Sequence, residues 1–597
     1  DSFGWFFVLT ANAMLIVSLI LAASRLGEVR LGGKGAVPHF SRGSWFAMLF
    51  SAGMGIGLVF WSVAEPIFHL GNPAPTTSIG QPEAARAAMS TTFFHWGLHA
   101  WGIYTVVAAA IAYFAYNKGL PLTIRSTFYP LLGDRVRGPL GHVIDILAVV
   151  ATLFGVATSL GLGVQQVNAG LHYIMPQTVA PSTSADGAGT LLGLSGTEVQ
   201  VLLIGGITLI ATVSVVSGLD RGVRLLSKLN VLIAAALLGA VFLLGPTVHL
   251  LDAFVQNLGE YIQSLIRMSF WTEAYQPPEA DGNPSSWQNG WTIFYWAWWL
   301  VFAPSMGLFV ARISRGRTIK QMVSGSIFFG SLGCFLFFMI LGNYGLSLQL
   351  SGELDVVAIL NAEGATKAIF SMLAQLPMST LVIAVFTLLC IIFTATTFDS
   401  ISYILASVVQ NNVTEEPMRW NRMFWAFTLS FLPTILMFLG GLSTLQTAAI
   451  VGGLPLLAIS VMLMISAVRA TNLDLRHQDA YIEPTINIEE LPDMDPWSAE
   501  GMALAQFEKE RDAAQEAAEL ERVAYTELAA VKKEIRAYVL GQGSQMETHE
   551  LPENLQQALE QAESNLSAAQ AKKLELSEQA QNARITFNQV VADLPLA

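Results

Sequence analysis

Charged residues are scarce in this chain of 597 residues, and cysteines are almost absent. Only 13% of the side chains are charged while 53% are hydrophobic, a composition typical of proteins that cross a membrane many times. The two cysteines, Cys334 and Cys390, fall inside hydrophobic stretches, so we expect neither a disulfide nor a cysteine metal site. The chain also lacks a Walker motif, a nucleophile elbow and a cluster of metal ligands. These absences argue against an ATP-driven pump and against an enzyme.

Hydrophobic stretches long enough to cross a bilayer recur along the first 470 residues. Lys and Arg collect in alternate loops, as after 4–24 and 91–116, whereas the loops 175–197 and 438–443 contain none. Because cytoplasmic loops are rich in Lys and Arg, the odd-numbered loops and the tail after Arg469 are predicted to be cytoplasmic. Eleven spans are predicted: 4–24, 44–65, 91–116, 142–174, 198–218, 225–247, 291–312, 319–344, 378–409, 420–438 and 442–468. This orientation puts Asp1 outside, and we expect one further span before it.

The tail is acidic and helical in character. From Asp474 onward it holds 24 acidic and 10 basic residues, a net of −14 against −13 for the whole chain, so the membrane part is close to neutral. Two runs of Ala and Leu at alternating spacings of four and three predict two helices that pack as a hairpin across 541–543. Glu521 interrupts the first run and Lys573 the second. The tail is either a solvated antiparallel coiled coil or a regulatory arm.

The remaining chain divides into two groups of five spans, 44–247 and 291–468, each opening with Gly or Pro inside its first span. These breakers lie in Ser51–Gly57 and Phe302–Gly307. A unit with an odd number of spans repeats with inverted topology, and paired broken spans point to a binding site at mid-membrane. We therefore predict an all-α membrane protein with two inverted five-helix repeats. The other predicted parts are a peripheral span and loop at 1–43, an outer-surface interfacial helix and loop at 248–290, and a cytosolic helical tail at 469–597.

Aromatic residues concentrate where the second repeat begins. Four Trp residues lie between Trp291 and Gly307, running along one span toward Pro304. A row of Trp at that depth predicts a lined cavity, since Trp otherwise collects at membrane interfaces. Trp101 and Tyr104 share a helix face in the first repeat, and Trp96 lies near them. Such rings suit a cation whose charge is covered by methyl groups.

With these motifs the chain resembles the betaine/choline/carnitine transporter (BCCT) family, especially its sodium-coupled betaine carriers. The resemblance covers about 1–470. It rests on Gly53–Gly57, Glu65–Pro66, His95–Trp96 with Trp101 and Tyr104, Trp296–Trp299, Ala311–Arg317 and Thr396–Ser400. It implies a LeuT-like core and secondary transport of a small onium solute, with no cofactor beyond sodium and no nucleic-acid partner. It also implies assembly as a homotrimer in the lipid bilayer of a bacterial plasma (inner) membrane.

The resemblance also implies site residues. The solute is expected to meet Trp96, Trp101, Tyr104, Trp298, Trp299, Phe302, Met54 and Gly55. Sodium is expected to bind the carbonyls of Ser51, Met54 and Phe393 and the hydroxyls of Thr396 and Thr397. A second sodium site would use Thr152 and Ser305.

Some positions depart from the family or leave alternatives open. Phe302 and Ser305 stand where sodium-coupled betaine carriers have Trp and Phe, and Gly57 stands where proton-coupled choline carriers have Asp. Glu65 is read as the end of a helix at the outer surface, and His95 and His99 as interior histidines with no acidic partner. The sequence leaves open glycine betaine, carnitine, choline and dimethylsulfoniopropionate as substrates. It also leaves open a sodium-independent exchanger, and a membrane osmosensor or scaffold signalling through the tail.

Overall fold

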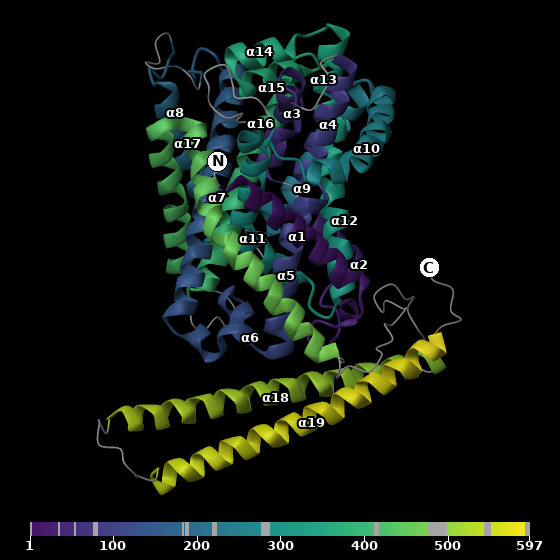
Figure 1. Cartoon of the computed structure of the whole chain (residues 1–597), viewed down its shortest axis with the longest axis vertical. Helices are drawn as coiled ribbons and strands as arrows, with labels where there is room; N and C mark the ends of the chain where they lie inside the picture. Colours follow the sequence, from purple (N-terminus) through teal and green to yellow (C-terminus); the bar gives the residue numbers. More distant parts are fainter. Residues whose placement is uncertain are drawn as a thin grey trace. The chain divides into compact units, whose positions relative to one another are not determined.

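The regular elements of the chain are helices throughout the part that the computed structural model describes. That part comprises 3–33, 36–52, 55–75, 81–181, 184, 190–217, 224–275, 287–410, 417–475, 496, 498–541 and 551–591. The chain forms two compact units, one of Asp1–Leu31 with Pro38–His477 and one of Gly32–Val37 with Gln478–Ala597. Figure 1 shows the first unit as a bundle of long helices and the second as two helices side by side.

The predicted spans correspond to helices, but fewer than the eleven predicted are long and apolar enough to cross a membrane. Eight described helices are long and apolar enough to cross a membrane, or nine when the bent pair Lys228–Leu244 and Thr247–Ser269 counts as one span. The predicted spans 420–438 and 442–468 both lie in α17 (Arg419–Leu475), of which Thr444–Ala470 qualifies. The protein is thus an all-helical, multi-pass membrane protein, as predicted.

The helix breaks fall only partly where the sequence places them. The first predicted break separates α2 (Arg42–Ala52) from α3 (Ile56–Gly71). A break that was not predicted lies at Gly97, between α4 (Gln81–Trp96) and α5 (Leu98–Lys118). Here a Cβ atom would come within 2.6 Å of the Phe93 carbonyl oxygen, so only glycine fits.

The second predicted break, at Phe302–Gly307, is wrong. α11 (Phe294–Ile313) continues through Pro304, after a single π-helical turn, η5 (Asn289–Ile293). Gly307 has a packing role instead, because a Cβ atom there would lie 2.7 Å from Val107 Cγ1 on α5. Proline is tolerated within such a helix when neighbouring helices enclose the freed backbone group.

The packing of the helices follows the predicted pairing of two repeats. α2 packs on α12 (Ile319–Phe337) as its counterpart α11 packs on α5. Likewise α7 (Pro139–Ile174) packs on α17, while its counterpart α16 (Ser379–Val408) packs on α8 (Gly196–Val216) and α9 (Arg224–Leu244). This exchange of partners is what a two-fold repeat produces. The exact domain boundaries remain a prediction.

α10 (Thr247–Ser269) is the helix predicted between the repeats, and it bends by 108° from the end of α9. Its inner face makes polar contacts, because the Asn257 amide donates to Asn343 Oδ1 and the Tyr261 hydroxyl accepts from the Leu98 N–H. Its apolar residues are divided between two faces. Phe254, Leu258 and Leu265 pack against the bundle, whereas Leu251, Val255, Ile262 and Ile266 are exposed.

The tail unit contains α18 (Ala499–Gly541) and α19 (Glu553–Val591), which pack along each other in opposite directions. Phe507 near the start of α18 stacks on Phe587 near the end of α19, with ring centroids 6.1 Å apart. The protected face includes Ala517, Ala524, Leu528 and Leu555, as the predicted runs require. Gln542 and Gly543 of the predicted turn lie outside the described residues.

Candidate functional site

A cavity of about 300 Å³ lies among α3, α4, α5, α7, α9, α11 and α16. It receives most of the predicted substrate residues and part of the predicted sodium set. Its lining consists of Gly55, Ile56, Gly57, Leu58, Trp96, Tyr104, Ser159, Asn230, Val231, Trp298, Trp299, Phe302, Met306, Phe309, Phe393, Thr396, Thr397, Ser400, Ile401 and Ile404. None of these side chains carries a formal charge.

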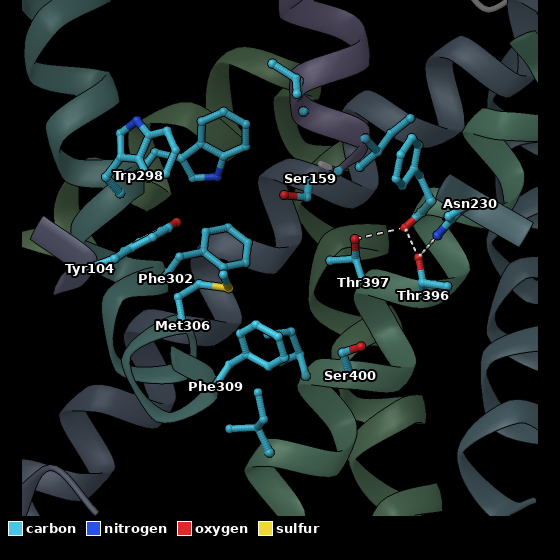
Figure 2. A pocket seen from close by; sticks show the side chains of 18 of the residues that line it. Tyr104, Ser159, Asn230, Trp298, Phe302, Met306, Phe309, Thr396, Thr397 and Ser400 are labelled. Atoms are coloured by element: carbon cyan, nitrogen blue, oxygen red, sulfur yellow. Dashed lines mark hydrogen bonds between the residues drawn. The ribbon is translucent and has the colours of Figure 1, made fainter. Parts of the chain in front are cut away.

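Aromatic rings from both repeats meet at one side of this cavity (Figure 2). The Trp96 ring lies 5.5 Å from Trp299 and 6.1 Å from Trp298, nearly perpendicular to each at 81° and 88°. Tyr104 lies 4.8 Å from Trp299, and Phe302 lies 6.3 Å from Trp298. Perpendicular rings offer faces in different directions, an arrangement that can surround a rounded cation.

Trp101 occupies a different place from its predicted one. Its side chain is fully buried and does not line the cavity. It packs behind the lining, 5.7 Å from Tyr104 and 6.1 Å from Trp299. Trp101 therefore supports two of the lining rings but does not itself line this cavity.

Hydrogen bonds fix the orientation of the three lining indoles. The N–H groups of Trp96, Trp298 and Trp299 donate to the Glu65 carboxylate at 2.8 Å, the Gly155 carbonyl at 3.3 Å and the His95 carbonyl at 3.0 Å. Each indole donor is therefore satisfied within the protein. What remains for a ligand is the π surface, which attracts cations and methyl groups.

The first helix break places a glycine directly against one of these rings. A Cβ atom on Gly57 would lie 2.4 Å from Trp298 Cη2, well inside contact distance. At position 57 any larger residue would displace Trp298, and this includes an Asp like that of the proton-coupled carriers. Gly57 thus helps to shape the aromatic wall.

Oxygen atoms gather on α16 at the opposite side of the cavity in Figure 2. The Phe393 carbonyl accepts from the Thr396 hydroxyl at 3.1 Å and from the Thr397 hydroxyl at 2.9 Å. Thr hydroxyls within a helix commonly donate to a carbonyl of the preceding turn. Carbonyl and hydroxyl oxygens are also the hard ligands that small cations prefer.

The other predicted sodium ligands are placed less completely. Met54 lies outside the described residues, and of Ser51 only its position within α2 is described. Thr152 donates to the Ala148 carbonyl at 2.9 Å and touches the Val301 carbonyl at 3.4 Å. Ser305 donates to the Phe302 carbonyl at 2.9 Å. The described contacts do not join Thr152 to Ser305, so the second sodium site remains a prediction.

The sequence analysis missed several lining residues. Asn230 of α9 donates to Thr396 Oγ1 at 2.6 Å, and a lone amide in an apolar span was a signal for it. Met306 and Phe309 follow Phe302 at helical spacing and extend the same wall. Ser159 and Ser400 add further hydroxyls, with no comparable signal in the sequence.

Glu65 differs most from its predicted role. It lies inside α3 and is fully buried, with no exposure to the outer surface. Its carboxylate contacts His95 Nδ1 at 2.7 Å, so the prediction that His95 has no acidic partner is wrong. Glu65, His69 and His95 bring potential ligand atoms within 4.8 Å of one another. The packing of α3 against α4 brings these three residues together. Glu65 and His95 are thirty positions apart in the sequence, so the sequence gave no sign of their contact.

His99 belongs to a separate network. Its Nε2 atom lies 2.9 Å from Asn12 Oδ1 and 3.1 Å from Ser269 Oγ, which joins α1 (Gly4–Ala23), α5 and α10. His99 is thus an interior histidine without an acidic partner, as predicted, although only its Nε2 atom is hydrogen-bonded and its buried Nδ1 atom has no partner among the described residues.

Known proteins resemble this chain over its membrane unit. A glycine betaine transporter of Acinetobacter baylyi is 39% identical over 81% of this chain and 69% of its own. The glycine betaine transporter OpuD of Bacillus subtilis is 39% identical over 78% and 86%, and glycine betaine transporter 1 of Vibrio parahaemolyticus is 40% identical over 78% and 85%. A solved Na+-coupled sialic acid symporter covers 81% of this chain and 98% of its own at 12% identity and a TM-score of 0.41, which is too low to carry an argument.

Residues 1–476, nearly the whole membrane unit and no part of the helical hairpin, match the family described as the betaine/carnitine/choline family transporter (BCCT). This chain belongs to that family of transporters.

Proposed function

We propose that this protein imports a small methylated onium compound together with sodium by alternating access. The observation that carries the proposal is a single cavity with an aromatic cage on one side and an oxygen cluster on the other. Glycine betaine, carnitine, choline and dimethylsulfoniopropionate are the candidate solutes. Similarity to glycine betaine transporters and to a high-affinity choline transport protein of Escherichia coli supports this class.

The cage suits an onium group for energetic reasons. A desolvated cation–π contact is worth about 2 kcal/mol, so several rings together supply enough energy for a micromolar-range site. A methylated cation donates no hydrogen bonds, and the lining indoles have none left to give. Phe302 stands in place of an indole and has no hydrogen-bond donor. It is the residue expected to tune the choice among onium solutes.

Sodium coupling rests on the oxygen cluster. An ion held by the Phe393 carbonyl and the hydroxyls of Thr396 and Thr397 would share the cavity with the solute. Both ligands then favour the same conformation, and the inward sodium gradient drives accumulation. Ser51 and Met54 are proposed to complete the first sodium shell.

The orientation, the tail and the assembly are part of the same proposal. The basic loops put the tail in the cytoplasm, where α18 and α19 would form a coiled coil. Exposed apolar residues on α10, including Val255 at 72% and Ile266 at 75%, are available for lipid or for neighbouring copies in a homotrimer.

Uptake of labelled glycine betaine into proteoliposomes tests the proposal, with and without an inward sodium gradient. We expect uptake to depend on the sodium gradient. Trp299→Ala should weaken the affinity for glycine betaine roughly thirtyfold, which corresponds to the loss of one cation–π contact. Trp420→Ala is the matched control, because Trp420 is exposed on α17 and lies outside the cavity.

Each other result points to a named alternative. Uptake that ignores sodium but requires solute on the opposite side would replace the symporter by an exchanger. Folded protein that takes up none of the four solutes would favour an osmosensor or scaffold.

A further inference from the structure

Four hydrogen-bonding groups converge on the buried carboxylate of Glu65. At Oε2, the Trp96 indole N–H donates at 2.8 Å and the Tyr295 hydroxyl at 2.5 Å. At Oε1, His95 Nδ1 lies at 2.7 Å and His69 Nε2 at 3.3 Å. These partners come from α3, α4 and α11, and each side chain of the group is buried.

This arrangement suits an ionised carboxylate. The Trp96 indole can only donate, and the Tyr295 hydroxyl donates to the same oxygen, so Oε2 carries no proton. His95 Nε2 lies 3.0 Å from Thr292 Oγ1, and when the threonine hydroxyl donates to Nε2, His95 Nδ1 donates to Oε1. In that arrangement four donors surround Glu65 and stabilise its negatively charged form.

That charge has no permanent cation beside it among the described residues. The ion pairs of Glu65 within the described chain are with His69 and His95 alone, and both histidines are used as neutral donors. A buried charge of this kind is costly unless an opposite charge compensates it. The cavity is the adjacent place where a cation is expected, and Trp96 is the side chain that both lines the cavity and bonds Glu65.

We propose that Glu65 is the counter-charge of the bound onium group and acts on it through Trp96. The inference rests on the proposed function, since it requires a cationic solute in the cavity. Two effects act in the same direction. The carboxylate attracts the cation across the ring through a medium of low dielectric constant, and an indole whose N–H donates to an anion is polarised toward a more negative π face. Glu65 is thus a positioning and charge-selecting residue that does not touch the solute.

A pair of ligands that differ only in charge isolates this effect. Glycine betaine and 3,3-dimethylbutanoate have the same shape, with nitrogen in one replaced by carbon in the other. Their inhibition constants against labelled glycine betaine uptake give a discrimination ratio for each variant. In Glu65→Gln, which keeps the size of the side chain, we expect the ratio to fall by roughly tenfold, the effect of one nearby charge.

Two further variants separate charge from geometry. Tyr295→Phe removes one hydrogen-bond donor to Glu65 Oε2 and leaves the carboxylate charge in place. It should therefore preserve the discrimination ratio even if the affinities for both compounds weaken. Glu65→Asp also keeps the charge and should keep the ratio within about threefold, which provides the test if Glu65→Gln does not fold. Folding is checked by size-exclusion chromatography in detergent.

The contrary results are distinct. A ratio unchanged in Glu65→Gln, with both compounds weakened alike, would reduce Glu65 to a structural hydrogen-bond acceptor and overturn the inference alone. A collapse of the ratio in Glu65→Asp would do the same. Wild-type protein that binds neither compound nor any other onium solute would overturn the proposed function, and this inference with it.

Discussion

Lys573 on α19 pairs with Glu521 on α18, with Nζ 2.5 Å from Oε2. These are the two residues that interrupt the apolar runs of the tail helices. In the hairpin Lys573 and Glu521 face each other, so each charge is paired with the opposite one. A one-turn slip of either helix would place a charge against an apolar face. The pair therefore selects one register, as a polar residue does at the core of a coiled coil.

Reversing one of these charges should loosen the hairpin. In Lys573→Glu two carboxylates would oppose each other, and because both positions are partly exposed the cost is about 1 kcal/mol. Hydrogen exchange of α18 and α19 in the full chain should then be roughly fivefold faster. The double variant Lys573→Glu with Glu521→Lys should restore wild-type exchange. Equal exchange in all three proteins would contradict a role in register.

Gly57→Ala should disturb the aromatic wall without touching the solute directly. The added Cβ atom would lie 2.4 Å from Trp298 Cη2, and overpacking of this kind costs about 1–3 kcal/mol. We expect the affinity for glycine betaine to drop roughly tenfold, measured by tryptophan fluorescence on titration. Adding Trp298→Phe shortens the ring and should recover part of the loss. Wild-type affinity in Gly57→Ala would show that Trp298 does not shape the site.

Thr397→Val should weaken sodium use more than solute recognition. It removes one proposed oxygen ligand and keeps the size of the side chain, and a lost contact to a charged group costs about 1.5–3 kcal/mol. The sodium concentration for half-maximal uptake should rise roughly tenfold or more. Thr428→Val is the control, since Thr428 is half-buried, lies outside the cavity and donates to the Phe424 carbonyl of its own helix. An unchanged sodium dependence would remove Thr397 from the site.

Removing the tail should leave transport intact. The membrane unit extends to His477, and the Tyr113 hydroxyl donates to the Ala470 carbonyl, so the truncation must begin at Gln478. We expect the truncated protein to retain sodium-driven uptake within about twofold and to lose only its regulation. Loss of uptake from a correctly folded truncation would favour the scaffold alternative.

The cavity illustrates what a sequence can predict about a binding site. Trp96, Tyr104, Trp298, Trp299 and Phe302 were predicted from the family resemblance to surround one solute, and all five line one cavity. Trp101 was assigned to the lining on the same grounds but packs behind it. A helical spacing tells which residues share a face and says nothing of how far that face lies from the cavity.

The sequence by itself determined the all-helical, membrane-spanning class of this protein, its pairing of two repeats and its acidic helical hairpin. These properties follow from local composition and periodicity, which act along the chain. The tertiary structure decided whether a helix breaks at a given Gly or Pro, as at Gly97 but not at Pro304, and which buried groups meet. Glu65 shows the difference, because its charge acquires a role only when α3, α4 and α11 pack and bring four hydrogen-bond partners and an aromatic wall against it.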